Sequence, residues 1–555
     1  MRKQTKLVAV LSTAALLALG ASMSSFAATG WQEENGTWVY YDKSGDTVTE
    51  KWEKSGDNWF YLNEDGEMAT DVVVEYNDNY YYVDENGAMA ANKWVSVENE
   101  DYGDDDDQPT NHWYYFGANG KAFKASTNSS NASFKIINGK KYAFDDEGKM
   151  LYGWIGTDGE RKTGDDAWQQ GVYYCGDEND GAQAVGWAHL EIIDDAYAYD
   201  QTSEGASSYN VFDDENQTRW FYFKTNGKKT TKEKGTTING KKYSFDADGR
   251  MNAEWVIFEA SPTKATATSA TAGKDGGQGA TGYTESWRYY GSPEDGARVT
   301  KGWFKVVPDS YLNTGDYEDD EDAWYYSDKD GKLVASKIQT INGKKYLFDH
   351  KGIMKSGLKF IKVEGKTVID IASDDKEDRY DTGSDFKDNA KAWIEKDYAA
   401  YYFGSGDDGA MKTGKQTVGI DGENFTFLFN KSGGSQGAGK TAIDSNKFYL
   451  AGMLLTADKD DKYAVVKKET SDSGKVSYKV MTSDEFIKED VVKNKVTTVN
   501  NKEYDAYYPV EDTNSEYKLI NTAGTIQKNK DKAKDGLDYC FKLKGDKIEA
   551  VYLEK

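Results

Sequence analysis

One six-residue segment, Ile-Asn-Gly-Lys-Lys-Tyr, occurs three times in the chain, at residues 137–142, 238–243 and 341–346. Each copy continues into an aromatic residue, an acidic turn and a glycine, and then reaches Met150, Met251 or Met354. A short alternating strand followed by an acidic turn with glycine is typical of a β-hairpin, because glycine tolerates the left-handed backbone of a tight reversal. Repetition at a spacing of about 100 residues predicts a fold built from one structural unit used many times.

A second pattern is a leading tryptophan, a spacer, and then a strand that reads Trp-Tyr-Tyr-Phe-Asp-x-x-Gly or a variant of it. Of the 15 tryptophans, seven are at the leading position and six at the strand position. The leading ones are Trp31, Trp52, Trp94, Trp154, Trp187, Trp255 and Trp303, and the strand ones are Trp38, Trp59, Trp113, Trp220, Trp287 and Trp324. In later repeats the spacer lengthens, and acidic or small-residue stretches at 98–108, 261–282 and 316–322 are predicted to be solvated excursions.

The composition fits many short strands, with 55 glycines, only 5 prolines and 14% aromatic residues. We therefore predict an all-β fold. It is a solenoid of stacked β-hairpin repeats with long loop insertions over residues 28–457. A divergent β C-terminal cap or small module follows at 458–555.

The two faces of each hairpin differ in the residue types that they carry. Side chains alternate along a strand, so the second and fourth residues of Trp-Tyr-Tyr-Phe share a face that stays bulky or apolar and is predicted to pack. The first and third residues are aromatic in the tryptophan units, but they are Lys141/Ala143, Lys242/Ser244 and Lys345/Leu347 in the three Lys-Lys-Tyr units. This difference favours a binding surface present in only some units. The alternative, rings that simply stack between neighbouring hairpins, remains open for any single tryptophan.

The first 27 residues predict a secretory signal peptide. A basic start with Arg2, Lys3 and Lys6 precedes an apolar run at 7–20 and a small-x-small site ending at Ala27. A net charge of -26 argues against nucleic acid as a partner, and no later stretch predicts a membrane span. The C-terminal residues lack an LPxTG-type sorting motif, so we expect non-covalent attachment to a cell. Cys175 and Cys540 exclude a disulfide framework and leave a single bridge open.

Catalytic and metal-binding motifs are weak. Residues 434–441 match a phosphate-binding loop literally, but they are predicted to be a glycine-rich hairpin loop because no helix pattern follows. His112, His189 and His350 are far apart and have no zinc-ligand spacing. Acidic turns such as 246–249 and 328–331 lack the further ligands of a calcium loop. We expect no enzymatic activity, no cofactor and no metal.

The tryptophan pattern resembles the cell-wall-binding, or choline-binding, repeat of Gram-positive surface proteins. The Ile-Asn-Gly-Lys-Lys-Tyr pattern resembles repeats of glucan-binding proteins and of the receptor-binding region of clostridial toxins. The resemblance covers about residues 30–440. It implies cages in which a leading and a strand tryptophan of one hairpin, with a tyrosine of the next, enclose a quaternary ammonium. The implied ligand-binding residues are Trp31, Trp38 and Tyr61; Trp52, Trp59 and Tyr82; Trp94 and Trp113; Trp187 and Trp220; and Trp303 and Trp324.

The resemblance implies a secreted, non-catalytic protein associated with the cell wall. Its partner would be choline on teichoic acid or another glycan polymer, and the same rings could stack on sugars. Two alternatives remain open: a glucan- or host-glycan-binding adhesin, and a cell-wall hydrolase whose catalytic module is the C-terminal region. The Ser244 and Leu347 positions lack the third ring, which puts complete cages next to them in doubt.

Overall fold

The structure is a computed structural model that describes residues 29–100, 102, 108–126, 131–194, 212, 214–372, 380, 382–510 and 515–554. The predicted signal peptide lies outside the described residues, as does much of the acidic stretch at 98–108. The chain divides into two compact units: Met1–Ile193 with Phe221–Thr230, and Asp194–Trp220 with Thr231–Lys555. Among the described residues, no helix has both the length and the apolar character needed to cross a membrane.

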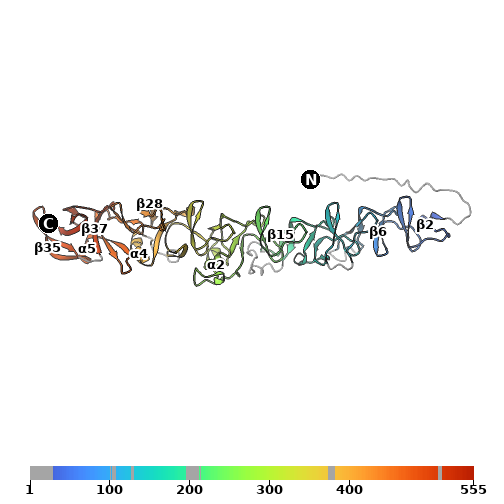
Figure 1. Cartoon of the computed structure of the whole chain (residues 1–555), viewed down its shortest axis with the longest axis horizontal. Helices are drawn as coiled ribbons and strands as arrows, with labels where there is room; N and C mark the ends of the chain where they lie inside the picture. The colour runs from blue at the N-terminus through green and yellow to red at the C-terminus, as the bar shows by residue number, and fades with distance from the viewer. Residues whose placement is uncertain are drawn as a thin grey trace. The chain divides into compact units, whose positions relative to one another are not determined.

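Short antiparallel strands are the main regular structure of both units (Figure 1). Those of unit 1 are β1 (Gly30–Glu34), β2 (Thr37–Tyr41), β3 (Lys51–Ser55), β4 (Asn58–Leu62), β5 (Val72–Tyr76), β6 (Asn79–Val83), β7 (Lys93–Glu98), β8 (Asn111–Phe116), β9 (Phe134–Ile137), β10 (Lys140–Ala143), β11 (Gly153–Ile155), β12 (Arg161–Lys162), β13 (Tyr173–Cys175) and β14 (Gly186–Ile193). Strand β15 (Asn216–Phe223) passes from unit 2 into unit 1 at Phe221.

Unit 2 continues with β16 (Glu233–Ile238), β17 (Lys241–Phe245), β18 (Trp255–Ile257), β19 (Trp287–Tyr289), β20 (Gly302–Val306), β21 (Ala323–Ser327), β22 (Lys337–Ile341), β23 (Lys344–Phe348), β24 (Met354–Lys355), β25 (Leu358–Glu364), β26 (Thr367–Ile371), β27 (Tyr398–Tyr402), β28 (Gly414–Ile420), β29 (Glu423–Phe429), β30 (Ala442–Asp444), β31 (Lys447–Leu450), β32 (Met453–Leu454), β33 (Tyr463–Thr470), β34 (Val476–Met481), β35 (Val491–Val499), β36 (Lys502–Pro509), β37 (Ser515–Asn521), β38 (Ala533–Lys534), β39 (Tyr539–Lys544) and β40 (Lys547–Leu553). The helices are α1 (Ala167–Gln170), α2 (Thr281–Thr284), α3 (Thr314–Glu318), α4 (Gly383–Glu395), α5 (Ser483–Glu489), η3 (Lys274–Gly276) and η4 (Gly406–Asp408).

The repeated segment reverses at its Asn-Gly pair, and the chain reverses again at the predicted acidic turn, where Phe144 forms an antiparallel bridge with Met150 and Gly148 has φ 88°. Strands β9 and β10 pair from Ile137↔Lys140 outward, with Asn138 at φ 49° and Gly139 at φ 83° between them. Two successive residues with positive φ form the type I′ turn, whose twist matches that of a hairpin. The copies at Asn239 and Asn342 repeat these angles, so the hexapeptide is itself the tip of a hairpin.

The residues after each acidic turn also join one hairpin to the hairpin before it. After the turn, the backbone N–H of Met68 donates to the carbonyl of Trp38 at 2.7 Å, and that of Met89 donates to Trp59 at 2.9 Å. Met150 bonds Trp113 at 2.7 Å in the same way, and in unit 2 Met251 bonds Trp220 at 2.8 Å. One backbone contact therefore recurs from repeat to repeat and stacks the hairpins.

Side chains reinforce this joint. A Cβ placed on Gly87, where φ is +78°, would lie 2.7 Å from Sδ of Met68, and one on Gly120 would lie even closer to Sδ of Met89. The thioether of one repeat thus occupies the space that a side chain on the next turn would need. This contact explains why the repeat carries both a turn glycine and a methionine two residues later.

The predicted packing face is confirmed. Phe60 and Leu62, Tyr114 and Phe116, Tyr142 and Phe144, and Phe221 and Phe223 are all buried. On the opposite face, which was predicted to be an open binding surface, two residues are buried. Tyr82 is buried against Phe116 with ring centroids 6.1 Å apart, and Trp287 is only 3% exposed, with Tyr283 6.2 Å away.

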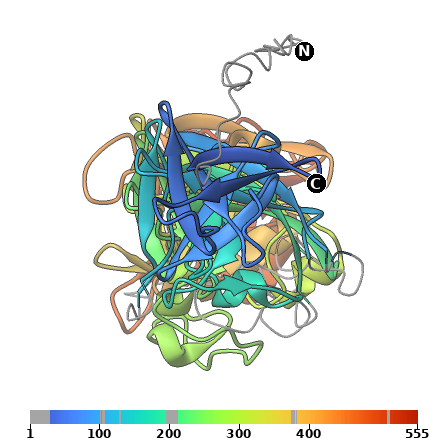
Figure 2. The same ribbon diagram turned by 90° about the vertical axis from the view of Figure 1, so that its right-hand side faces the viewer.

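The 261–282 segment is not the solvated excursion that its composition predicted. Gln278 and Ala280 are buried, and the adjoining Tyr283 of α2 lies in a core with Trp255 and Trp287. The Tyr283 hydroxyl donates to the carbonyls of Thr263 and Tyr311, which ties the segment to the body of unit 2. Figures 1 and 2 show this segment, with α2, projecting from one side of the strands it covers.

The C-terminal part forms larger sheets. Their strand orders are β24-β23-β22-β26-β25-β27, β28-β29-β32-β31-β30, β34-β33-β37 and β35-β36-β40-β39-β38. One hydrophobic core runs from Leu358 to Ile526 and includes α4, so it holds residues on both sides of the expected boundary at 457. Residues 434–441 join β29 to β30 as a hairpin loop, as predicted, and Lys440 pairs with Asp444 at 2.6 Å. Cys175 and Cys540 are buried free thiols.

Candidate ligand-binding sites

The leading tryptophan of a repeat packs between two hairpins. The ring of Trp31 lies 5.3 Å from Tyr40 across its own hairpin and 5.3 Å from Phe60 of the next. Trp52, Trp94 and Trp303 have the same two kinds of neighbour, at 4.8 to 5.2 Å: Tyr61 and Tyr81, Tyr115 and Tyr142, and Tyr326 and Tyr346. Such pairs contribute about 0.5–1.5 kcal/mol each beyond their burial. Each of these four leading rings is therefore in contact with aromatic rings of its own hairpin and of the next one.

The strand tryptophans range from exposed to buried, and most of them are half-buried, as are the leading Trp31, Trp52, Trp94 and Trp303. Trp59 is 41% exposed, and Trp38, Trp113, Trp220 and Trp324 are half-buried. Trp324 stands nearly perpendicular to Trp303, at 6.2 Å and 87°. Its indole N–H is buried without a hydrogen-bond partner in the part of the chain that the structure describes. The adhesive role predicted from the sequence requires these five rings to be accessible, and none of them is sealed in a core.

The third rings expected for the first two cages are placed differently. Tyr61 is half-buried and lies 5.2 Å from Trp52 and 6.1 Å from Tyr76, so its ring belongs to the second repeat's own packing. The hydroxyl of the buried Tyr82 donates to Asp71. Burial, with this bond second in importance, raises the pKa of Tyr82. The structure thus does not place Tyr82 on an open face beside Trp59.

Trp187 and Trp220, which the sequence predicted to form one site, belong to different units. Trp187 is half-buried and lies 5.1 Å from Tyr222 in unit 1. In unit 2 the indole N–H of Trp220 donates to Glu294 at 3.3 Å. Both rings therefore already have protein partners.

One aromatic site is filled by the protein's own cation. The ammonium of Lys229 lies 5.1 Å from the ring of Trp154 and 5.9 Å from that of Phe221, and it also donates to the carbonyl of Trp168. These are cation–π distances. The repeat of Trp154 thus contains an internal ammonium in contact with the rings that an external cation would use.

Beside Trp113 the structure has a cleft of about 260 Å³. Strand β8 supplies His112 and Trp113, the acidic turn after β10 supplies Asp145, and Tyr152, Arg161 and Glu178 come from later segments of unit 1. Met150 lies in its wall, and its N–H bonds the Trp113 carbonyl, so the joint between hairpins also positions the ring. The cleft combines aromatic side chains with two carboxylates and two cations, Lys149 and Arg161.

The charges in this cleft are held in place. Asp145 Oδ1 accepts the backbone N–H groups of Glu147 at 3.0 Å and Lys149 at 2.7 Å. Burial nevertheless raises the pKa of Asp145 to about 6, because desolvation outweighs these bonds. The Arg161 guanidinium is 4.0 Å from the Tyr152 ring centre, and this stacking holds it at the wall.

The sequence predicted a site at Trp94 and Trp113. It did not predict that His112, Asp145, Arg161 and Glu178 line the cleft beside Trp113. No local spacing reveals these residues, because they come from four separate stretches. The only available signal was that Asp145 begins the acidic turn after a repeat.

Comparison with protein families identifies the repeats. Residues 48–94 match the choline-binding repeat, and residues 110–122 match the putative cell wall binding repeat. These segments contain Trp52, Trp59, Tyr82 and Trp94, and Trp113, respectively. Residues 48–94 and 110–122 are therefore similar to choline-binding and cell-wall-binding repeats, and they form short antiparallel strands.

A curated relative is Glucosyltransferase-S of Streptococcus mutans, which is 29% identical over 214 residues. The match covers 38% of this chain and 11% of the relative, so the chain spans about a tenth of that relative's length.

Similar solved structures include two proteins of Streptococcus pneumoniae. Choline binding protein F, in the presence of a peptidoglycan analogue, is 18% identical with a TM-score of 0.31, and the match covers 74% of this chain and 99% of that one. The modular autolysin LytC, in complex with a synthetic peptidoglycan ligand, is 18% identical with a TM-score of 0.30, and the match covers 60% of this chain and 55% of that one. The chain thus spans about half the length of LytC.

Proposed function

We propose that this protein is secreted, has no catalytic activity of its own, and attaches non-covalently to a cell-wall polymer through tryptophan sites along its repeats. The observation that carries the proposal is the Trp113 cleft, in which Trp113 belongs to a matched repeat and is accompanied by the carboxylates of Asp145 and Glu178 and the cations of Lys149 and Arg161. A quaternary ammonium such as choline is attracted by the indole ring, and the two carboxylates offset the charge of the two protein cations.

A single site of this kind binds weakly. A cation–π contact contributes about 0.5–2 kcal/mol, and a site worth about 4 kcal/mol has a millimolar Kd. Several sites on one chain can engage a repeating polymer together and raise the apparent affinity by about 10²–10⁴-fold. Trp59, as the most exposed strand tryptophan on a matched repeat, is a second contact in this proposal.

A glucan-type polymer is the second candidate ligand, and the match to Glucosyltransferase-S supports it. The same indole faces stack on sugar rings, and no cation is then required. The two candidates differ in their competitor: free choline should displace the first polymer and glucan oligosaccharides the second.

The test is elution of the mature protein from choline-bearing cell walls and from immobilised glucan. We expect free choline to elute wild-type protein from the walls and Trp113→Ala to be retained less at equal protein concentration. Lys141→Ala provides the matched control, because the neighbouring Lys-Lys-Tyr unit lacks a tryptophan at that strand position. Elution by glucan oligosaccharides alone would favour the second candidate, and retention unaffected by both competitors would refute the proposal.

A further inference from the structure

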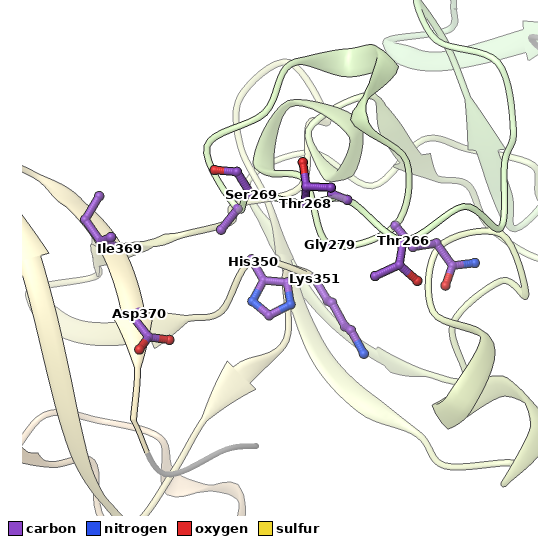
Figure 3. Close-up of a pocket in the computed structure, with 11 residues that line it drawn as sticks. Thr266, Thr268, Ser269, Gly279, His350, Lys351, Ile369 and Asp370 are labelled. Carbon is purple, nitrogen blue, oxygen red and sulfur yellow. The ribbon is translucent and has the colours of Figure 1, made fainter. Parts of the chain in front are cut away.

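A second cavity lies in unit 2 and involves none of the tryptophan sites. It has a volume of about 330 Å³ and opens between the 261–282 segment, the turn that holds His350, and strand β26 (Figure 3). Thr266, Thr268 and Ser269 line one side, Ile369 and Asp370 the other, and His350 lies between them. The volume is at the small end of the range for ligand pockets, about 300–1,000 Å³.

The cavity wall is built from fixed backbone. Gln278 is buried, its backbone N–H donates to the Ala265 carbonyl at 2.8 Å, and its own carbonyl accepts from Ala267 at 2.7 Å. Its side-chain amide donates to the Ser310 carbonyl at 2.7 Å and to the Thr314 hydroxyl at 2.9 Å. The segment that forms one wall is therefore anchored, although its outer residues face solvent.

The opposite wall meets the segment at Gly279, which lies beside the His350 ring. A Cβ on Gly279 would be 3.5 Å from His350 Cδ2, an ordinary van der Waals contact, and the φ of +88° at this position favours glycine. The His350 turn is held by the Thr284 hydroxyl, which donates to the His350 carbonyl at 2.7 Å. The imidazole is thus positioned by its backbone, and neither ring nitrogen has a hydrogen-bond partner within the described ranges.

The polar groups of the cavity match a neutral ligand rich in hydroxyls. The Thr266 and Thr268 hydroxyls and the His350 imidazole are free of hydrogen bonds to described residues, and together they can donate and accept. The charges are balanced, with Lys351 on one side and Asp370 on the other. Lys351 is bonded to Asn313 at 3.0 Å, and Asp370 accepts from the Tyr398 hydroxyl. A polyanion or a bare cation finds no excess of opposite charge here.

Apolar atoms complete the match. The side chains of Ala267, Ala270 and Ile369 also line the cavity. A sugar ring presents both hydroxyls and C–H faces, and a lining that contains both polar and apolar groups suits it. We propose that this cavity is a binding site for a single sugar unit of a neutral saccharide, distinct from the tryptophan sites and independent of the function proposed above.

The chain offers a direct probe, because His112, His189 and His350 are its only histidines. In protein labelled with ¹³C at histidine, the three imidazole signals can be assigned by His→Ala substitution of each. We expect glucose, galactose or N-acetylglucosamine to shift the His350 signal in a saturable way and to leave the exposed His189 signal unchanged. His112 lines the Trp113 cleft, so free choline should shift that signal and not that of His350.

The two proposals fail separately in this experiment. A choline-dependent shift of His112 without any sugar-dependent shift of His350 would overturn the saccharide site alone. A shift of His350 by choline would also overturn it, because the site would then take a cation. A shift of His350 by sugar with no response of His112 to choline would leave the saccharide site supported and count against the Trp113 cleft.

A blocking variant tests the cavity in the folded protein. Thr268→Trp places a large ring at the mouth of the cavity. We expect the sugar affinity, measured from the saturation of the His350 shift, to fall at least tenfold. The matched control is Ser261→Trp, an exposed position in the same segment that does not line the cavity. Equal sugar binding by both variants would refute the assignment, and a far-UV circular dichroism spectrum like that of wild type verifies that each is folded.

Discussion

Within a repeat, the leading and the strand tryptophan are surrounded differently. A leading ring such as Trp94 touches Tyr115 in its own hairpin and Tyr142 in the next, so both hairpins depend on it. A strand ring such as Trp113 has the hairpin joint on one side and a cleft on the other. The first residue is mainly a structural contact and the second a candidate ligand contact.

This difference predicts opposite phenotypes for two alanine variants. Trp94→Ala should lower the free energy of unfolding by about 2–4 kcal/mol, since removing a large packed ring leaves a cavity. Trp113→Ala should cost less stability and lower the affinity for free choline about tenfold, which corresponds to about 1.4 kcal/mol. Urea denaturation followed by circular dichroism and choline titration separate the two effects. The interpretation is wrong if Trp94→Ala is as stable as wild type and binds worse than Trp113→Ala.

Asp145 gives the Trp113 cleft a pH dependence. Burial raises its pKa to about 6 from its ordinary value of 3.8, so the group is mostly neutral at pH 5 and mostly charged at pH 7. A cation should therefore bind severalfold more tightly at pH 7 than at pH 5. Between about pH 4 and 6 the folded state holds this proton more tightly than the unfolded state, so the contribution of Asp145 to stability falls as pH rises.

The variant Asp145→Asn keeps an acceptor for the two backbone N–H groups and removes the titration. We expect its choline affinity to change less between pH 5 and pH 7 than that of wild type, as measured by calorimetry at both values. An unchanged pH profile in this variant would assign the dependence to other groups of the cleft.

At the residue scale the sequence predicted the packing face correctly and the open face in part. Alternation alone reveals which strand residues share a face, which is why Phe60 and Phe116 were identified as core. It cannot reveal what covers the other face. Trp287 is buried because a segment inserted elsewhere in the repeat supplies Tyr283 against it. Asp145 and Arg161 meet at a cleft for the same reason, through contacts between separate segments.

At the scale of the hairpin, the contact between a methionine and the next turn glycine predicts a specific loss of stability. Gly87→Ala places a Cβ 2.7 Å from Met68 Sδ at a φ of +78°. Overpacking costs about 1–3 kcal/mol and left-handed strain about 1–2 kcal/mol, so we expect a total of about 2–5 kcal/mol. Urea denaturation measures this loss.

Gly36→Ala is the matched control, because Gly36 has φ +88° and a Cβ added there would have no atom within 4 Å. Gly36→Ala should lower the free energy of unfolding only by the cost of the left-handed backbone, about 1–2 kcal/mol. In a double-mutant cycle, Met68→Ala should recover part of the loss caused by Gly87→Ala, since it removes the atom that clashes. Additive effects of the two substitutions would contradict the proposed contact.

Hairpins were predictable as elements because their turn residues are local. The Asn-Gly pair fixes the reversal through two positive φ values, and no tertiary contact is needed. The 261–282 segment was not predictable, since its small and polar residues look solvated while a few buried residues, Gln278 and Ala280 among them, anchor it. Of the larger sheets, the two made of β33 to β40 fall in the stretch predicted as divergent β structure, and the two made of β22 to β32 fall in the stretch predicted as hairpin repeats.

For the whole chain, the net charge of -26 predicts how binding responds to salt. If the polymer is recognised through choline, long-range attraction should weaken as the Debye length falls from about 10 Å at 0.1 M to about 3 Å at 1 M salt. We expect retention on choline-bearing walls to fall severalfold across this range and retention on neutral glucan to stay constant. Salt-independent retention on both supports would exclude the electrostatic part of the recognition.

Because the bond from Met68 to the Trp38 carbonyl joins backbone to backbone, and recurs at Met89, Met150 and Met251, the fastening of one hairpin to the next does not depend on which side chains face outward. A gene of this kind can gain or lose a repeat by unequal recombination and still encode a chain whose neighbours fit. Under the proposed function, the number of ligand contacts and the distance between them can then change among such chains while the joint between hairpins is kept.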